Sequence, residues 1–469
     1  MRKEIVCLVG GALLFLLAIS TKAQNYPKEP SGTLPVLYLN TEGNQEIVSK
    51  DNYLNAEWWF DSKQIDGIES IGSESLPQKL QIKGRGNWSW AWFEKKPFRI
   101  KLEKKESFCG LKANKNYCLL ANADDTLAYL RNTVGFEMSK RIGLKWTPQQ
   151  VPIELMINGD YRGLYFLTEK INVGKDRVSI EEQKDGEKAP ESITGGWLLE
   201  IDQYKDPQQI EITEGNGKSL KFTYHTPDSL SEEQEKYLYD IVSKMDAAIY
   251  EADKTSTLWE ELIDLETLVK FYIVQEIMDN TESFHGSCYL YKDRGDKEKF
   301  YFGPVWDFGI CYDEVIDNNF IYDDPPYGQS WIGEIAKYPR FQAQVKKTWL
   351  DFEKRGCLEI DDFIDSFITQ ISLAAQLDYE RWPMYASDWR LKERSKDLQY
   401  EVNLFKKYIH EKIWWLKSVW SENYTGVDKI DVETNSKISK GVYSIDGKIL
   451  PSIRKGRINI QNGKKYIIN

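Results

Sequence analysis

The chain has 469 residues, of which 41% are apolar and 29% charged, so it can bury a sizeable core in one large domain or in a few smaller ones. Its formal net charge of −11 argues against nonspecific binding of nucleic acid, which needs a basic surface. The three histidines argue against a His-rich zinc site, and the motifs HExxH, Walker A and GxSxG are absent from the sequence.

The first residues have the three-part pattern of a secretory signal. Arg2 and Lys3 precede an apolar run that ends at Ile19, and the small residues of TKA (21–23) offer a cleavage point. The run is shorter than the ~20 residues that a membrane-spanning helix needs, which argues against the alternative of an anchor. We therefore interpret 1–23 as a signal peptide. The mature protein is expected to be secreted, without a transmembrane segment, in the periplasm, the outer membrane or at the cell surface.

After a leader at 24–34, rich in Pro, Ser and Gly, strand patterns dominate the first half of the chain. In FRIKLEK (98–104) apolar and charged residues alternate, which is typical of a half-buried strand. Asn158-Gly159 lies between two alternating segments and predicts a β-hairpin. These patterns predict one helix, 126–142, and strands at 35–40, 80–83, 98–102, 151–157, 164–167 and 196–201.

The second half has mostly helical patterns. Helices are predicted at about 238–249, 258–278, 340–355, 359–380 and 391–420, with a strand pair at 288–292 and 299–305 between them. From 423 the sequence changes to short alternating segments with turn dipeptides, so 423–469 is predicted to be a small β module. The expected fold class is α+β, with a β-rich N-terminal half and a helical C-terminal half in a main domain at 35–422.

Two segments have the composition of a phosphate and metal site. KGRGN (83–87), with Lys95 and Lys96 downstream, combines glycines that let backbone amides approach a ligand with cations that suit phosphate. The alternative is a basic loop between strands. Asp307, in WDFG directly after a predicted strand, could hold a metal against phosphate oxygens. The alternative there is an Asp that caps a turn.

Two further segments could supply a general base and an ion pair. DNTES (279–283) follows a predicted helix and contains two acids and an amide, which could serve as a general base and as metal ligands. The alternative is that these residues only form a polar helix end. Glu169, beside Lys170, could orient a phosphate-binding lysine, or could be a surface residue of its strand.

Taken in order, these segments resemble the CotH kinase family, named for a spore coat protein. The matching strings are KGRGNWSW…KKPFRIKL, LLANADDTLAYLRNTVGFEMSKRIG, VPIELMINGDYRGLYFLTEKI, GGWLLEID, NTESFHGSCYLYKD and FGPVWDFG. Their number and order, over about 35–315, make the resemblance specific. It implies a divergent, secreted protein-kinase-like fold that transfers phosphate from ATP, with Mg²⁺ or Mn²⁺, to Ser of extracytoplasmic proteins.

The resemblance also implies roles for single residues. Asp307 matches the family's metal-binding Asp, while the position often taken by a second Asp holds Gly309. Glu282 stands where the family has its proposed catalytic Asp. Ser287 stands where the family often has an Asn, which is a metal-ligand position. The resemblance places the nucleotide near four residues of the matching strings: Arg85, Lys96, Arg131 and Glu169.

These departures favour an alternative function. A Glu in place of Asp moves the carboxylate by about 1 Å, a displacement that can cost on the order of a hundredfold in rate. The chain could then be a catalytically impaired, kinase-like binding protein of the cell surface, with a protein or polysaccharide ligand. Trp88, Trp90 and Trp92 alternate and could stack on sugar rings, or could form the core face of a strand. A glycosidase that uses Glu282 and Asp307 as its carboxylate pair is chemically allowed.

The tail has a resemblance of its own. GVYSIDGKIL…KGRINIQNGKKYIIN is similar to the short C-terminal sorting modules of proteins secreted by Bacteroidetes-type bacteria. This resemblance implies an outer-membrane route or a place on the cell surface. The alternative is a simple β addition to the main domain.

Overall fold

The computed structural model describes residues 26–312, 318–323, 330–385, 392–393, 395 and 397–421, together with the short strands at 442–443, 449–450, 458–461 and 464–467. The predicted signal peptide lies outside the described residues. By its internal contacts the chain divides into two units, Met1–Ser421 and Glu422–Asn469. No helix within the described ranges has both the length and the apolar character that crossing a membrane requires.

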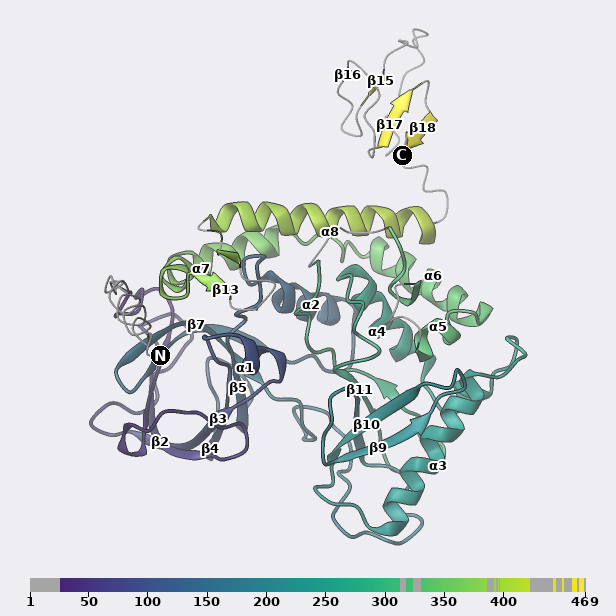
Figure 1. The fold of residues 1–469 in the computed structure, drawn as a ribbon, viewed down its shortest axis with the longest axis horizontal. Helices are drawn as coiled ribbons and strands as arrows, with labels where there is room; N and C mark the ends of the chain where they lie inside the picture. The colour runs from purple at the N-terminus through teal and green to yellow at the C-terminus, as the bar shows by residue number, and fades with distance from the viewer. Residues whose placement is uncertain are drawn as a thin grey trace, which may run out of the picture. The chain divides into compact units, whose positions relative to one another are not determined.

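The N-terminal part of the first unit is a closed β-barrel, drawn in purple and blue in Figure 1. Neighbouring strands follow the order β1-β2-β3-β4-β5-β7-β6, and they pair antiparallel except where β6 meets β1. The strands are β1 (Val36–Thr41), β2 (Leu54–Asp61), β3 (Gln78–Gly84), β4 (Phe98–Glu106), β5 (Asn114–Leu120), β6 (Gln150–Ile157) and β7 (Asp160–Glu169).

Alternating apolar residues fill the barrel. Leu80 pairs with Leu102 and Ile82 with Ile100 across β3 and β4, and all four side chains are buried, whereas the polar residues between them, Gln81 and Lys101, are exposed. Each side chain buried in this way contributes about 1.5–3 kcal/mol of hydrophobic stabilisation. The predicted strands at 80–83 and 98–102 are therefore confirmed.

The predicted hairpin is also confirmed. Asn158 and Gly159 have φ values of 52° and 76°, as the two central residues of a type I′ turn require. Ile157 pairs with Asp160 directly across the turn. The Asn158 side chain accepts a hydrogen bond from the Thr41 amide at 2.8 Å, which ties the turn to the end of β1.

A second, antiparallel sheet follows in the order β12-β11-β8-β10-β9. All residues of β8 are buried, which is typical of a strand covered on both faces. The strands are β8 (Trp197–Ile201), β9 (Gln209–Thr213), β10 (Ser219–Thr226), β11 (Cys288–Lys292) and β12 (Tyr301–Phe302). The predicted strand at 299–305 is shortened because Gly303 has a φ of 112° and Pro304 has no amide hydrogen to donate to a sheet.

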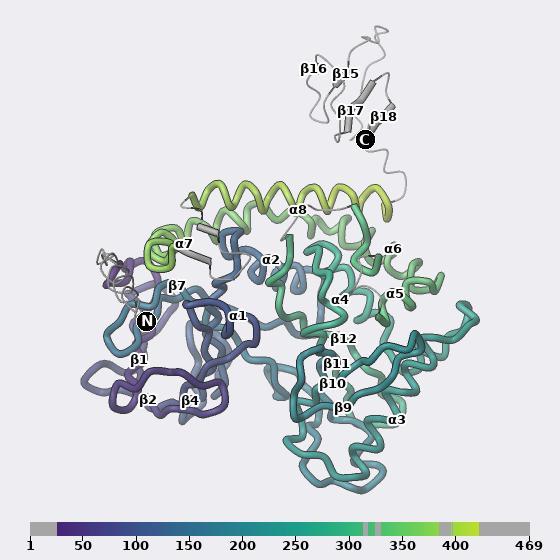
Figure 2. The backbone as a smooth tube through the Cα atoms, viewed as in Figure 1, coloured from purple at the N-terminus to yellow at the C-terminus, as the bar shows by residue number. Residues whose placement is uncertain are grey.

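The helices dominate the C-terminal half, as the pattern predicted. They are α1 (Trp88–Trp92), α2 (Leu130–Ile142), α3 (Glu232–Ile249), α4 (Leu265–Ile277), α5 (Trp331–Ile335), α6 (Pro339–Lys354), α7 (Asp361–Arg381) and α8 (Leu398–Trp420). Helix α4 is buried nearly all round and packs against α2, α6 and α8, while α7 packs on β7 of the barrel (Figure 2). A mixed α/β fold of this kind is consistent with the α+β class.

Two predicted helices and one strand alternative were wrong. The helix predicted at about 391–420 begins only at Leu398, and Lys392–Glu393 form a short strand instead. The single helix at 258–278 is broken into a 3₁₀ turn (Leu258–Glu261) and α4, because the Asp264 side chain caps α4 by accepting from the Thr267 amide at 2.8 Å. The alternating tryptophans belong to the short helix α1 and not to a strand.

The segment read as a leader is joined to the barrel. The amide and hydroxyl of Ser31 donate to the buried Glu154 carboxylate on β6, at 2.8 and 2.6 Å. Leu34 is fully buried. Residues 31–34 are therefore part of the fold.

A buried ion pair joins the barrel to α7. Lys95 Nζ lies 2.9 Å from Asp378 Oδ1, and both side chains are almost fully buried, at 2% and 0% exposure. Lys95 also donates to the Leu164 carbonyl, and the Tyr129 hydroxyl donates to Asp378. Removing one partner of such a pair leaves a buried charge, which costs about 3–5 kcal/mol.

The remaining strands are short. A two-stranded sheet of β13 (Met384–Tyr385) and β14 (Lys392–Glu393) belongs to the first unit. The second unit has a sheet in the order β16-β15-β17-β18, made of β15 (Val442–Tyr443), β16 (Ile449–Leu450), β17 (Ile458–Gln461) and β18 (Lys464–Ile467). Its predicted turn dipeptides, at 446–447 and 462–463, lie outside the described residues, and its sorting role stays a prediction.

Candidate functional site

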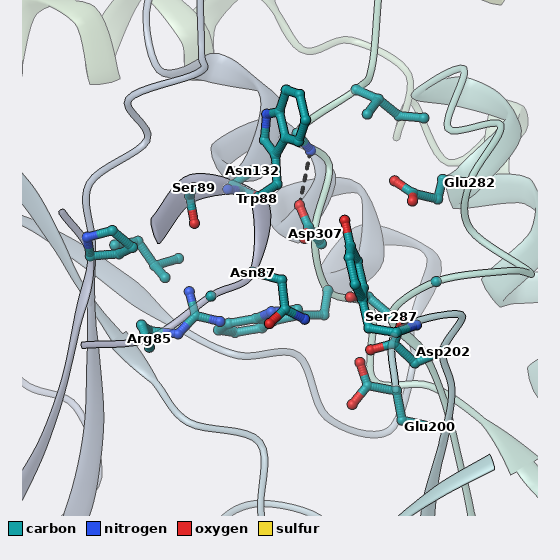
Figure 3. Close-up of a pocket in the computed structure, with 18 of the residues that line it drawn as sticks. Arg85, Asn87, Trp88, Ser89, Asn132, Glu200, Asp202, Glu282, Ser287 and Asp307 are labelled. Carbon is teal, nitrogen blue, oxygen red and sulfur yellow. Dashed lines mark hydrogen bonds between the residues drawn. The ribbon is translucent and has the colours of Figure 1, made fainter. Parts of the chain in front are cut away.

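A cavity of about 1150 Å³ lies between the barrel and the second sheet. Figure 3 shows its side chains converging from segments far apart in the sequence, including Arg85 after β3, Asp202 after β8 and Glu282 after α4. A space of this size holds a ligand as large as a nucleotide.

The barrel contributes the cations of the cavity. Lys83 and Arg99 stand directly opposite each other on β3 and β4, and Arg85 and Lys170 follow β3 and β7. Burial, and then the charge of Arg99, lower the pKa of Lys170 to about 8. Like charges placed opposite each other destabilise a sheet. A bound anion would relieve this repulsion, so the barrel side of the cavity suits phosphate.

The opposite side is acidic. Burial, and then the charge of Asp307, raise the pKa values of Glu282 and Asp124 to about 7 each. Asp202 has a pKa of about 7 because it is buried and lies near Glu200. Carboxylates that raise one another's pKa in this way would be stabilised by a cation. The cavity is thus divided into a cationic and an acidic part.

Asp307 is held in place from two helices. It has a φ of 58°, an uncommon value for a residue other than glycine. The Asn280 side chain, just beyond α4, donates to the Asp307 carbonyl at 3.1 Å, and the next amide, of Phe308, donates to Asn132 of α2 at 3.0 Å. Phe308 is fully buried against Gly135 of α2. The WDFG turn is therefore fixed by packing as well as by hydrogen bonds.

Glu282 is oriented by a chain of polar contacts. Its Oε1 accepts from Gln203 Nε2 at 2.8 Å, and Gln203 Oε1 lies 3.0 Å from His285 Nε2. The amides of His285 and Gly286 both donate to the Glu282 carbonyl at 2.9 Å. The loop between α4 and β11 thus presents the Glu282 carboxylate to the cavity, as Figure 3 shows.

Four of the residues singled out in the sequence meet in this cavity: Arg85, Glu282, Ser287 and Asp307. They come from three separate segments of the chain, because Glu282 and Ser287 share the loop between α4 and β11. Arg85 lies over the Trp306 ring, with its guanidinium carbon 5.5 Å from the ring centre.

Three other candidates have partners elsewhere. Lys96 Nζ donates to the Trp90 carbonyl at 2.6 Å. Glu169 pairs with the buried Arg177. Arg131 is 1% exposed and donates to the carbonyls of Cys311 and Asp124, at 2.6 and 2.9 Å. None of the three lines the cavity.

Several residues of the cavity were missed. Lys170, Asp124 and Asp202 all stand in strings that carry the family resemblance, TEKI, ANADD and LLEID. Their place in those strings was the signal available, but a string does not say which side chain faces a cavity.

The donor chemistry suits a hard divalent cation. Among the described residues, no group of three or more His, Cys, Asp or Glu side chains is arranged to hold a metal ion by itself. Mg²⁺ is usually held by one or two carboxylates together with substrate phosphates and water, so a full set of protein ligands is not required. The carboxylates around Asp307, next to the cationic part of the cavity, fit that kind of shared site.

Comparison with known proteins agrees with this geometry. The family model described as CotH kinase protein matches residues 82–416, a region that contains the cavity residues named above. A search of curated proteins finds no match. Because the family model covers most of the chain and the quoted strings meet at one cavity, the chain belongs to the CotH kinase family.

Proposed function

We propose that this protein is a protein kinase that transfers phosphate from ATP to Ser of extracytoplasmic proteins, with Mg²⁺ or Mn²⁺. The observation that carries the proposal is the division of the cavity into a cationic barrel side and an acidic side. Phosphoryl transfer needs such a division, because cations must hold the phosphates while a carboxylate accepts the proton of the incoming hydroxyl.

The cations of the barrel would hold the nucleotide. Lys83, Arg85, Arg99 and Lys170 offer charge-assisted hydrogen bonds to phosphate oxygens. Asp307 would hold the divalent ion, which when bound supplies charge neutralisation for the phosphate oxygens. This division of labour differs from what the resemblance alone implies: Lys170 reaches the cavity, whereas Lys96, Arg131 and Glu169 do not.

Glu282 would act as the general base. In the transfer, the Ser hydroxyl oxygen bonds to the γ-phosphorus while the bond between that phosphorus and the β,γ-bridging oxygen breaks. The electron pair leaves with ADP, and the hydroxyl proton passes to the Glu282 carboxylate. A pKa of about 7 suits this task, because a base is most effective when its pKa lies near the working pH.

The features that favoured a sugar-binding protein are weaker in the fold. Trp90 packs against Phe98 and close to Gly84, and Trp88 packs against Trp92. The three tryptophans therefore do not form one exposed platform. A glycosidase would make no use of the cations opposite Asp307 and Glu282.

The cellular location belongs to the same proposal. The signal-like pattern of 1–23 and the sorting-like pattern of the tail together support export, with the kinase facing proteins outside the cytoplasmic membrane.

The proposal is tested by following the γ-phosphate. The purified protein is incubated with ATP labelled in its γ-phosphate, Mn²⁺ and dephosphorylated casein, and phosphorylated residues are located by mass spectrometry. We expect labelled Ser that is lost in Asp307→Asn and in Glu282→Gln. Glu103→Gln, an exposed change on β4, should match the wild type. Absence of transfer from the wild type, with ATP unable to protect it from thermal unfolding, would overturn the proposal.

A further inference from the structure

The glycine that follows Phe308 is not required by the backbone. Gly309 does not adopt a left-handed φ, and it lies in the turn that carries Asp307. A side chain at this position would meet two carboxylates instead. A Cβ built on Gly309 would lie 3.1 Å from Asp307 Oδ1 and 3.2 Å from Asp124 Oδ2. The two oxygens therefore converge on one small space at the edge of the cavity.

The two loops that bring these carboxylates together are fixed by one buried guanidinium. Arg131 donates to the Asp124 carbonyl at 2.9 Å and to the Cys311 carbonyl at 2.6 Å. The loop before α2 and the loop after Phe308 are thus tied to the same side chain. Arg131 is 1% exposed and does not line the cavity. It therefore binds the backbone of both loops without occupying the space that the two carboxylates face.

The neighbouring acid has a different task. Asp125 Oδ1 accepts from the Leu127 amide at 2.9 Å, and its Oδ2 accepts from the Arg131 amide at 3.1 Å. Asp125 therefore satisfies an otherwise free amide in the first turn of α2. Asp124 lines the cavity, so the pair Asp124-Asp125 divides into one residue for the fold and one for the site.

We propose that Asp124 is the second carboxylate of the metal–phosphate site, in the space that a side chain at position 309 would otherwise occupy. This inference rests on the proposed function and adds a ligand from the loop between β5 and α2. Two carboxylates with phosphate oxygens and water satisfy the usual environment of Mg²⁺ or Mn²⁺. The assignment also explains the glycine, because a larger residue at 309 would compete with Asp124.

The test measures binding of Mn²⁺ alone, by the paramagnetic resonance signal of the free ion. ATP binding without metal is measured separately, by quenching of tryptophan fluorescence. We expect Asp124→Asn to weaken Mn²⁺ binding at least on the order of tenfold, the loss that follows even when a residue supporting a metal ligand is removed. Asp206→Asn, a matched acid of the same cavity, should change Mn²⁺ binding less than about threefold. ATP binding without metal should persist in Asp124→Asn, which also reports that the variant is folded.

A relocation of the carboxylate gives the sharpest outcome. In the double variant, Asp124→Ala removes the carboxylate beside position 309, and Gly309→Asp supplies a new carboxylate from the turn that carries Asp307. We expect it to recover Mn²⁺ binding that Asp124→Ala alone has lost. Wild-type Mn²⁺ affinity in Asp124→Asn, alongside weakened affinity in Asp307→Asn, would overturn this inference and leave the proposed function standing. A wild-type protein that binds neither Mn²⁺ nor ATP would overturn both.

Discussion

Replacing Gly135 with alanine should move the Asp307 turn without touching the cavity itself. Gly135 lies on α2, and a Cβ at this position would be 2.4 Å from the Phe308 ring. Carbon atoms in contact are normally about 3.5–4.0 Å apart, so the ring must retreat by about 1 Å. Phe308 is fully buried, and the ring has no solvent to move into.

The two energetic effects of this change partly cancel. Forcing an extra methyl into a packed core costs about 1–3 kcal/mol, whereas replacing a helical glycine by alanine returns up to about 1 kcal/mol. Urea unfolding should therefore show a net loss of about 0–3 kcal/mol, which is less than the stability of a typical domain. The rate is more sensitive, because a shift of about 1 Å at a catalytic group can cost on the order of a hundredfold.

The assay is the rate of γ-phosphate transfer, compared with urea unfolding of the same samples. Gly174→Ala is the matched control, because its Cβ would have ordinary contacts, the nearest at 3.7 Å, and its φ is not left-handed. We expect a fall of on the order of a hundredfold in Gly135→Ala and none in Gly174→Ala. A folded Gly135→Ala protein with the wild-type rate would refute the claim that Phe308 sets the position of Asp307.

Three further changes test other parts of the account. Lys170→Gln should weaken ATP binding by about 10- to 100-fold, which corresponds to the loss of one charge-assisted hydrogen bond, while Lys101→Gln, at an exposed position, should not. If both variants lost the same ATP affinity in a fluorescence titration, Lys170 would not be part of a phosphate site. The transfer rate of the wild type should increase as the pH rises to about 7, because Glu282 accepts a proton only when it is ionised. The rate of Glu282→Gln should be lower by about 10²- to 10⁴-fold and should not increase over this pH range. A wild-type rate that falls over the same pH range would contradict the assignment. Lys95→Met should lower the free energy of unfolding in urea by about 3–5 kcal/mol, and adding Asp378→Asn should recover part of this loss. An unchanged urea midpoint in Lys95→Met would show that the ion pair does not hold the barrel to α7.

The sequence predicted the elements whose pattern is local. Strand β4 alternates cleanly and the β6–β7 turn has its Asn-Gly dipeptide, so both were predictable. Strand β2 was missed because its adjacent Trp58 and Trp59 hide the alternation: Trp58 is buried, whereas Trp59 stacks on Tyr38 outside that core. Closure of the barrel depends on the parallel pairing of β1 with β6, which no local pattern records.

The site was predictable as a set of segments but not as a set of side chains. Glu169 and Lys170 are neighbours at the end of β7, and successive residues of a strand point to opposite faces. Lys170 therefore lines the cavity while Glu169 pairs with Arg177. A matching string places residues along the chain, and only the fold decides which of two neighbours reaches the ligand.

The central claim is that one cavity holds a metal-bound triphosphate between the barrel cations and Asp307. The most direct measurement is X-ray diffraction from crystals grown with Mn²⁺ and a non-hydrolysable ATP analogue, using the anomalous signal of manganese. The account predicts a manganese peak at the Asp307 carboxylate and phosphate density against Arg85 and Lys170. An empty cavity, or a nucleotide bound at another surface while these side chains keep their positions, would contradict it.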